Sequence, residues 1–197
     1  DILRILARYR IEAQWLPAAR QMVNNTFNAV LSPAGFCLND IPSDQKIAEM
    51  RFKFPLNCCS VSSLTAIAQR HGIQLSASPG KLDGYMNGII DLVVMHENRY
   101  YLIDYKTHAL GSLDAYTAPQ LDHFMTSTGY ALQYLIYVVA LHRWLSLRKK
   151  AYDYTRHFGG AFYLFTRGMP PQRSDSGIFH CLPPCALITA LDDCFYS

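Results

Sequence analysis

The sequence lacks a hydrophobic run long enough to cross a membrane. Its longest apolar stretch lies within residues 130–141 and contains Gln133, whereas a membrane-spanning helix needs about 20 apolar residues. Charged residues are also scarce, at 17% against a usual share of about 25%. Hydrophobic residues make up 50%, which excludes an extended disordered tail, because such tails are poor in hydrophobic residues. The composition predicts a globular domain with a large core and no membrane anchor.

Two chemical signatures are missing as well. No Gly-x-x-x-x-Gly-Lys-Ser/Thr loop is present, since Gly80-Lys81 is followed by Leu82, and we therefore expect no ATPase motor in this sequence. No histidine pair lies at zinc-finger spacing with partner cysteines; the histidines considered are His108, His123, His142, His157 and His180. The net charge of +3 permits contact with a phosphate backbone but does not require it.

The first residues, Asp1-Ile2-Leu3-Arg4, include neither a start methionine nor a basic segment followed by an apolar one. We interpret the sequence as a C-terminal fragment of a longer chain, without a signal peptide. Six cysteines in 197 residues, without a secretory leader, favour reduced thiols over a disulfide framework. The expected compartment is the cytoplasm.

Hydrophobic periodicity divides the sequence into a leading helical segment, residues 1–45, and a core, residues 46–197, which together form one domain. Helices are expected on both sides of a small mixed sheet, so the fold class is α/β, on the border of α+β. The expected elements are a helix from Pro17 to about Ser32, a strand over Ala48–Phe54 closed by Pro55, a short helix over Leu64–Ala68 with Ser60, Ser62 or Ser63 as its cap, strands over Tyr85–Met95 and Arg99–Lys106, a helical stretch from Gly111 to Arg148 interrupted near Pro119, strands over Gly159–Thr166 and Gly177–Cys181, and a helix over Pro184–Phe195.

The strands on either side of residues 96–99 should form a hairpin that brings two carboxylates together. If Glu97 and Asn98 form the loop, Asp91 lies opposite Asp104. Two unit charges about 5 Å apart repel by roughly 3 kcal/mol at an effective dielectric constant near 20. A divalent cation between the carboxylates would offset this repulsion, and Mg²⁺ prefers such oxygen ligands. The pair therefore indicates a metal site.

Lys106 lies two residues beyond Asp104, so its amine shares the carboxylate face of the strand. The opposite face is expected to carry Ile90, Leu92, Val94, Tyr101, Ile103 and Tyr105. An alternative is a structural ion pair, either Asp104–Lys106 or Asp91–Lys106. Glu-Asn is also not a favoured two-residue turn, and a register shift by two would keep the face but change the pairing. These alternatives stay open at this point.

A recognisable set of segments runs through the core. It comprises Gly88–Val93, Tyr100–Lys106, Gln133–Tyr137, Leu141–Leu145, Tyr152–Tyr154, His157–Gly160 and Tyr163–Phe165. The set, which covers most of residues 46–197, resembles the PD-(D/E)xK nuclease domain of the RecB family, a subunit of bacterial helicase–nucleases of the exodeoxyribonuclease V type. Asp-x-Lys alone is a weak signal, but the ordered set is specific. The resemblance implies a restriction-endonuclease-like mixed sheet flanked by helices.

The resemblance also implies roles for individual residues. Asp91 and Asp104 match the metal-binding carboxylates, the backbone carbonyl of Tyr105 matches a further ligand, and Lys106 matches the catalytic lysine. Glu49 matches the upstream acidic position, which the strand pattern alone would make an exposed residue.

Gln133 and Tyr137 match a supporting Gln-x-x-x-Tyr element, and their spacing places them on one helix face. Without the resemblance, the pair would be interpreted as part of a packed helix. The family's metal site also uses a histidine upstream of the glutamate, whereas no histidine precedes His71 here. The ligand either lies before residue 1 or has been replaced.

The function implied by the resemblance is metal-dependent hydrolysis of DNA, with Mg²⁺ as cofactor and Ca²⁺ as a non-catalytic or inhibitory substitute. The implied partners are linear DNA, single strands threaded from a helicase, and RecC- and RecD-type subunits, in double-strand-break repair and degradation of linear DNA. A nuclease-like docking module without activity is the alternative. The retention of Asp91, Asp104 and Lys106 together argues against it.

Related nucleases carry a four-cysteine iron–sulfur cluster, but the RecB branch is not expected to do so. Cys181, Cys185 and Cys194, with Cys37 or Cys58 upstream, are separated by three and eight residues, a poor match to such a cluster. Other residues are candidates for DNA contact, although solvated charges and core aromatics remain the simpler interpretation. These candidates are Lys81, Arg99, Arg143, Arg148, Lys149, Tyr116 and Tyr130.

Overall fold

The protein is built on a five-stranded mixed sheet in the order β1-β2-β3-β4-β5, in which only the β3–β4 pair is parallel. The computed structural model describes residues 2–173 and 175–196. The strands are β1 (Lys46–Ser60), β2 (Lys81–His96), β3 (Arg99–Lys106), β4 (Phe158–Phe165) and β5 (Ile178–Cys181). The helices are α1 (Ile2–Arg8), α2 (Leu16–Asn28), α3 (Val61–Arg70), α4 (Ala118–Ser127), α5 (Tyr130–Arg148), α6 (Tyr154–His157) and α7 (Cys185–Tyr196). The expected mixed sheet flanked by helices is confirmed.

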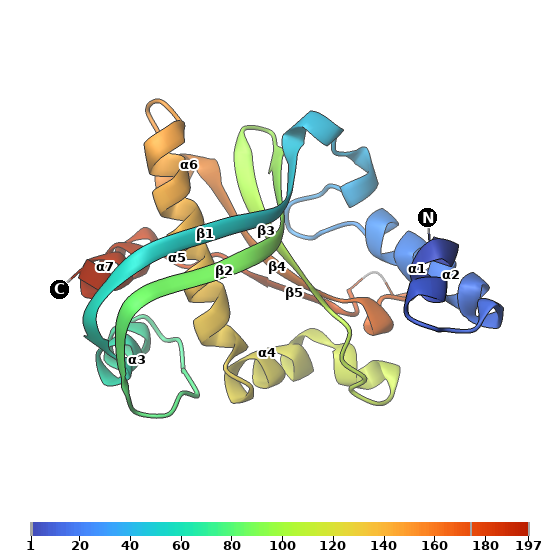
Figure 1. Cartoon of the computed structure of the whole chain (residues 1–197), viewed down its shortest axis with the longest axis horizontal. Coiled ribbons are helices and arrows are strands. Elements are labelled where there is room, and N and C mark those ends of the chain that lie inside the picture. The colour runs from blue at the N-terminus through green and yellow to red at the C-terminus, as the bar shows by residue number, and fades with distance from the viewer. Residues whose placement is uncertain (1, 174, 197) are drawn as a thin grey trace.

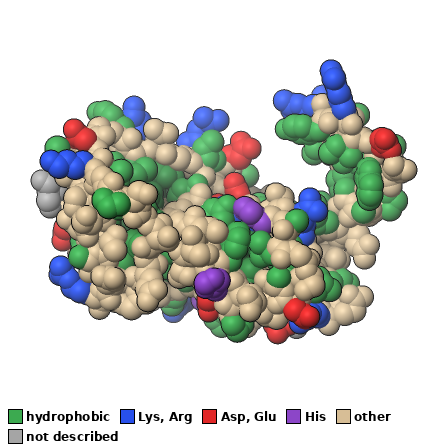
Figure 2. All heavy atoms as spheres, turned by 90° about the horizontal axis from the view of Figure 1, so that it is seen from below, with side chains coloured by type: hydrophobic (Ala, Val, Ile, Leu, Met, Phe, Trp, Pro, Cys, Tyr) green, Lys and Arg blue, Asp and Glu red, His purple; other side chains and the backbone are tan. Residues whose placement is uncertain are grey.

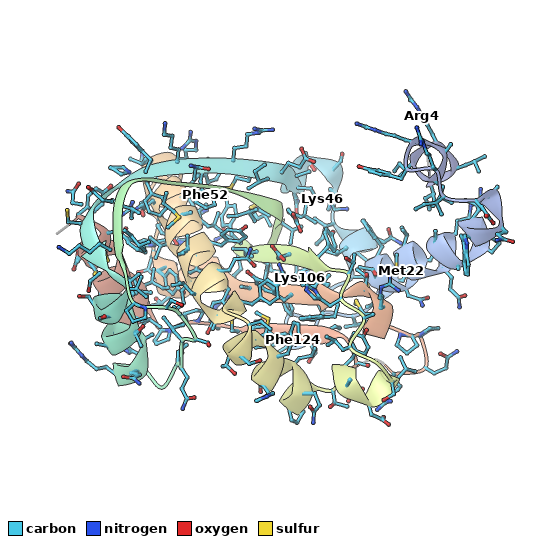
Figure 3. All side chains as sticks on the ribbon, turned by 60° about the horizontal axis from the view of Figure 1, so that its bottom comes forward. Arg4, Met22, Lys46, Phe52, Lys106 and Phe124 are labelled. Atoms are coloured by element: carbon cyan, nitrogen blue, oxygen red, sulfur yellow. The ribbon has the colours of Figure 1, made fainter. Side chains whose placement is uncertain are left out.

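Helices cover the two faces of this sheet unequally. On one face α3, α5 and α7 bury the larger core, and α5 crosses beneath β1 and β2 (Figure 1). On the other face α2 and residues 31–41 cover a smaller cluster that includes Leu92 and Ile103. Helix α1, which carries Arg4, precedes α2 and stands away from the sheet. A hollow separates α1 from the rest of the molecule (Figures 2 and 3).

Strand β1 is longer than the pattern predicts. It was expected to end at Pro55, but it continues to Ser60, and Pro55 pairs in register with Tyr85. The prediction was wrong because β1 lies at the edge of the sheet, where a residue without an N–H group is tolerated. Ser60 then caps α3 by accepting a hydrogen bond from the Ser63 amide at 2.9 Å.

The β2–β3 hairpin has the loop that was expected. Glu97 and Asn98 both adopt left-handed backbone angles, with φ of 48° and 61°, as a type I′ turn requires. His96 therefore pairs with Arg99, and Leu92 pairs with Ile103. No register shift occurs in this ladder, whose last pair, Leu92–Ile103, directly adjoins Asp91 and Asp104.

One face assignment was wrong. Ile90 packs in the larger core beside α5, whereas Leu92 faces the smaller cluster on the other side. A regular strand would place both on one face. The regular alternation fails opposite Glu49, whose φ of 51° interrupts β1 between the Ala48–Leu92 and Met50–Ile90 pairs. Because of this irregularity, Asp91 lies at a change of face.

The long helical stretch before Arg148 is interrupted near Pro119, as expected, because extended Thr117 separates a short 3₁₀ helix, Leu113–Tyr116, from α4. Pro119 lies in the first turn of α4, where proline is tolerated. A second break, which was not expected, comes at Gly129, whose φ is 78°. Within the described part of the chain no single helix is long and apolar enough to span a membrane; α4 and α5 reach that length only as a pair bent by 85°.

Candidate active site

Asp91 lies where β2 and β3 separate. The last pair of this ladder is Leu92–Ile103, and beyond it β2 continues beside β1 alone. At this point Oδ2 of Asp91 accepts a hydrogen bond of 2.9 Å from the backbone amide of Tyr105. The carboxylate thus replaces a backbone acceptor and is held against the end of β3.

Asp104 is a buried carboxylate paired with Lys106. Its exposed fraction is 3%, and its Oδ1 lies 2.5 Å from Nζ of Lys106. In this ion pair, Lys106 is the charge partner of the buried Oδ1. Burial raises the pKa of Asp104, Lys106 opposes this rise, and the Asp91 charge adds to it. A cation beside Asp104 would favour its charged form.

The ammonium of Lys106 is enclosed on several sides. Besides the carboxylate of Asp104, it donates a hydrogen bond of 3.0 Å to Oε1 of Gln133. It also lies 4.1 Å from the ring centre of Tyr130 and 5.0 Å from that of Tyr163. In Figure 3 Lys106 lies near the centre of the molecule, above Phe124 of α4. The ammonium is therefore held in one place before any substrate binds.

Gln133 connects the lysine to α5. Its Oε1 also accepts a hydrogen bond of 3.2 Å from the Tyr163 hydroxyl, and its Nε2 donates one of 3.2 Å to the Tyr137 hydroxyl. Burial raises the pKa of Tyr137, and the negative charge of Asp104 raises it further. Gln133 and Tyr137 thus face the carboxylates from one side of the helix, as their spacing predicts.

Tyr130 and His108 also lie beside Lys106; the sequence suggested Tyr130 only as a candidate DNA contact and did not assign His108 to the site. The Tyr130 hydroxyl lies 3.2 Å from Nε2 of His108, and the His108 ring contacts the rings of Phe124 and Phe165. Tyr130 precedes Gln133 by three residues on α5, so helical spacing was the available signal. The tyrosine ring covers the lysine, and the histidine holds the tyrosine.

Glu49 is not part of the cluster formed by Asp91, Asp104 and Lys106. It is exposed on β1, opposite Asp91 in the register. Within residues 2–173 and 175–196, no three His, Cys, Asp or Glu side chains come together in a way that could hold a metal ion. The metal donors predicted from the sequence are the carboxylates of Asp91 and Asp104 and the backbone carbonyl of Tyr105. These are oxygen donors, and the buried Oδ1 of Asp104 has the Lys106 ammonium as its charged partner, so the chemistry of the predicted donors fits a hard divalent cation.

Several candidate DNA contacts have other partners. Tyr116 is buried, and its hydroxyl donates a hydrogen bond of 2.8 Å to the carbonyl of His108. Arg143 forms an ion pair with Asp192. Lys149 donates to the side chain of Asn98 at 3.0 Å. These contacts assign structural roles to the three side chains.

The comparison with known proteins agrees with this geometry. Residues 39–183 match the PD-(D/E)XK nuclease superfamily, and the chain belongs to this family of nucleases. Its members generally use divalent metal ions.

Similar curated proteins carry the name RecBCD enzyme subunit RecB. The protein of Escherichia coli (strain K12) is 37% identical over 190 residues, which are 93% of this chain and 16% of that protein. The Haemophilus influenzae protein is 40% identical over 165 residues, 82% of this chain and 14% of that protein. The Mycobacterium tuberculosis (strain ATCC 25618 / H37Rv) protein is 42% identical over 120 residues, 57% of this chain and 11% of that protein. The chain thus spans about a sixth or less of the length of these relatives.

Proposed function

We propose that the chain is a Mg²⁺-dependent DNA nuclease of the exodeoxyribonuclease V type, which hydrolyses phosphodiester bonds of linear DNA. The observation that carries this proposal is the convergence of Asp91, Asp104 and Lys106 in a chain of the PD-(D/E)XK nuclease superfamily. A buried carboxylate such as Asp104, beside the half-buried carboxylate of Asp91, costs free energy unless a cation or another charge compensates it. Its presence beside a held ammonium is explained by function more readily than by stability.

The residues have separate roles in this proposal. Asp91, Asp104 and the Tyr105 carbonyl hold the ion. When bound, Mg²⁺ polarises the scissile phosphate and lowers the pKa of the attacking water. The Lys106 ammonium, fixed by Asp104 and Gln133, either orients that water or neutralises the charge that develops on the phosphate oxygens.

Supporting roles fall to residues around this centre. Gln133 and Tyr137 hold Lys106 in position through the hydrogen bonds described above. Glu49 is the acidic residue of β1 opposite Asp91, and its carboxylate acts from the rim of the site on the ion or on its water ligands.

We also propose that the chain is the nuclease part of an ATP-dependent helicase–nuclease that acts in double-strand-break repair and degrades linear DNA. In this proposal it receives single strands from the helicase, assembles with RecC- and RecD-type subunits and acts in the cytoplasm. The support is the similarity, over 93% of the chain, to a protein named as a subunit of the RecBCD enzyme.

The test is cleavage of end-labelled linear DNA by the purified chain in Mg²⁺, in Ca²⁺ and in EDTA. We expect short products in Mg²⁺ only, and their loss in Asp104→Asn. Asp83→Asn is the matched control, because Asp83 is an exposed aspartate of β2. DNA binding without cleavage in any divalent metal would instead support the inactive docking module.

A further inference from the structure

A groove runs along the free edge of β1, away from the carboxylates. It lies between residues 51–55 of β1, the C-terminal half of α5 and α7, and its volume is about 490 Å³. We call it the β1 edge groove. Figure 1 shows the three elements meeting on the side of the sheet where β1 has no neighbouring strand. No residue assigned to the active site lines it.

Positive charge dominates the β1 edge groove. Arg51, Lys53 and Arg148 line it, and all three are exposed. The acidic residue that lines the groove, Asp192, is already paired with Arg143. The groove therefore has three exposed cations along its lining.

Aromatic rings contact two of these cations, and the Lys53 ammonium lies 4.3 Å from the ring centre of Tyr85 on β2. The Arg148 guanidinium sits 4.9 Å from the ring centre of Trp144, and Tyr196 is 53% exposed at the α7 side. Phe52 lines the groove from β1 and is partly buried. Cations interleaved with aromatic rings are the usual platform for a single nucleic-acid strand, because the cations contact phosphates and the rings stack on bases.

The groove and the active site lie along the same helix. Gln133, Tyr137, Trp144 and Arg148 follow one face of α5, and the Phe52 ring of the groove contacts the Tyr137 ring at 5.6 Å. At 1.5 Å per residue, the helix from Gln133 to Arg148 is about 22 Å long. That length corresponds to about six nucleotides at a stacked spacing of 3.4 Å.

We propose that the β1 edge groove binds a single DNA strand outside the cleavage centre, with Arg51, Lys53 and Arg148 on its phosphates and Trp144 against a base. The proposal rests on the proposed nuclease function, which makes DNA the ligand of this chain. The other occupant with suitable chemistry is an acidic peptide that pairs with the free edge of β1.

The first experiment measures binding of labelled oligothymidylates of four and twelve nucleotides by fluorescence anisotropy in Ca²⁺ at several salt concentrations. The longer strand should bind more tightly to the wild-type chain. The triple variant Arg51→Gln/Lys53→Gln/Arg148→Gln should bind the two strands with more similar affinity. The slope of its log affinity against log salt concentration should fall by about 2, or about 0.7 for each lost contact. At 0.1 M salt this slope change corresponds to about 100-fold weaker binding.

A matched control removes the same charge elsewhere. Arg4→Gln/Arg20→Gln/Arg70→Gln neutralises three exposed cations that do not line the groove, and this variant should still bind the twelve-nucleotide strand more tightly than the four-nucleotide strand. Equal loss in both triple variants would overturn the proposal, because the effect would then be one of net charge. Wild-type binding by the groove variant would overturn it as well.

The second measurement uses the tryptophans of the chain, which number two. In a Trp15→Phe background the remaining fluorescence comes from Trp144, and the twelve-nucleotide strand should quench it. Quenching by polyglutamate but not by the strand would assign the groove to an acidic peptide and overturn the proposal. Neither measurement depends on cleavage. If the chain cuts DNA in Mg²⁺ but the strand does not quench Trp144, the nuclease function is supported and DNA binding in the β1 edge groove is refuted.

Discussion

Nζ of Lys106 lies 2.5 Å from Oδ1 of Asp104, and the two side chains are only 10% and 5% exposed. The ion pair that the sequence left as an alternative is therefore present, inside the same cluster as the second carboxylate, Asp91. Pairing and catalysis are not exclusive here. The lysine compensates the buried charge of Asp104 and is held by Gln133 where a substrate phosphate would meet the carboxylates.

Replacing Lys106 separates the roles of this pair. Lys106→Met should lower the single-turnover cleavage rate by about 100- to 1,000-fold, the usual effect of removing one group that stabilises developing negative charge. DNA affinity in Ca²⁺ should change little, because a contact made in the transition state adds little to ground-state binding. Cleavage and anisotropy on the same preparation measure both effects.

A melting curve of the Lys106→Met protein completes this test, with Lys150→Met, at an exposed position, as control. A purely structural ion pair would give an unchanged cleavage rate and a fall in stability of roughly 3 kcal/mol, because Asp104 would be left buried and unpaired. A simple phosphate anchor would weaken binding and lower the salt slope by about 0.7 on a single strand.

Tyr130 should act as a positioning residue for Lys106 through its ring. A cation–π contact contributes about 0.5–2 kcal/mol, so Tyr130→Leu should slow cleavage by about 2- to 30-fold. Tyr130→Phe keeps the ring and loses the hydrogen bond to His108, and it should stay near the wild-type rate. Equal rates in wild type and Tyr130→Leu would show that the ring does not hold the ammonium.

His180 should make the fold sensitive to acid. Burial lowers the pKa of His180 below its usual 6.5, and its Nε2 is buried without a hydrogen-bond partner among the described residues. The unfolded chain then takes up a proton at a higher pH than the folded chain, so stability falls as the pH drops from about 7 to 5. Melting curves of His180→Leu should show a weaker pH dependence than those of the wild type.

His123→Gln, a change at an exposed histidine, is the control for this experiment and should keep the wild-type pH dependence. Asp104 acts in the opposite direction, because its raised pKa makes the folded state take up a proton as the pH falls. The informative quantity is therefore the difference in pH dependence of stability between each variant and the wild type. Parallel curves for His180→Leu and wild type would contradict the assignment.

The sequence predicts the carboxylate pair because a hairpin is a local structure. Once Glu97 and Asn98 form the loop, the position of Asp91 relative to Asp104 follows from counting along two strands. The same locality explains why Gln133 and Tyr137 could be placed on one helix face. Short-range rules of turn and helix geometry suffice for these residues.

The remaining contacts depend on long-range packing. Tyr163 reaches Gln133 only because β4 pairs in parallel with β3 and α5 crosses that sheet, and no pattern within either segment records this. The switch of face at Ile90 follows from the left-handed backbone of Glu49, an unusual conformation for a glutamate. Alternation rules assume regular strands, so they failed at this position.

Calorimetric titration of Mg²⁺ into the wild-type chain and into Asp104→Asn, with cleavage of linear DNA measured on the same samples, tests whether Asp104 holds the catalytic metal ion. We expect the wild type to bind the ion and cut DNA, and Asp104→Asn, still folded by its melting curve, to lose both. Metal binding and cleavage by a pure Asp104→Asn protein at wild-type levels would contradict this expectation.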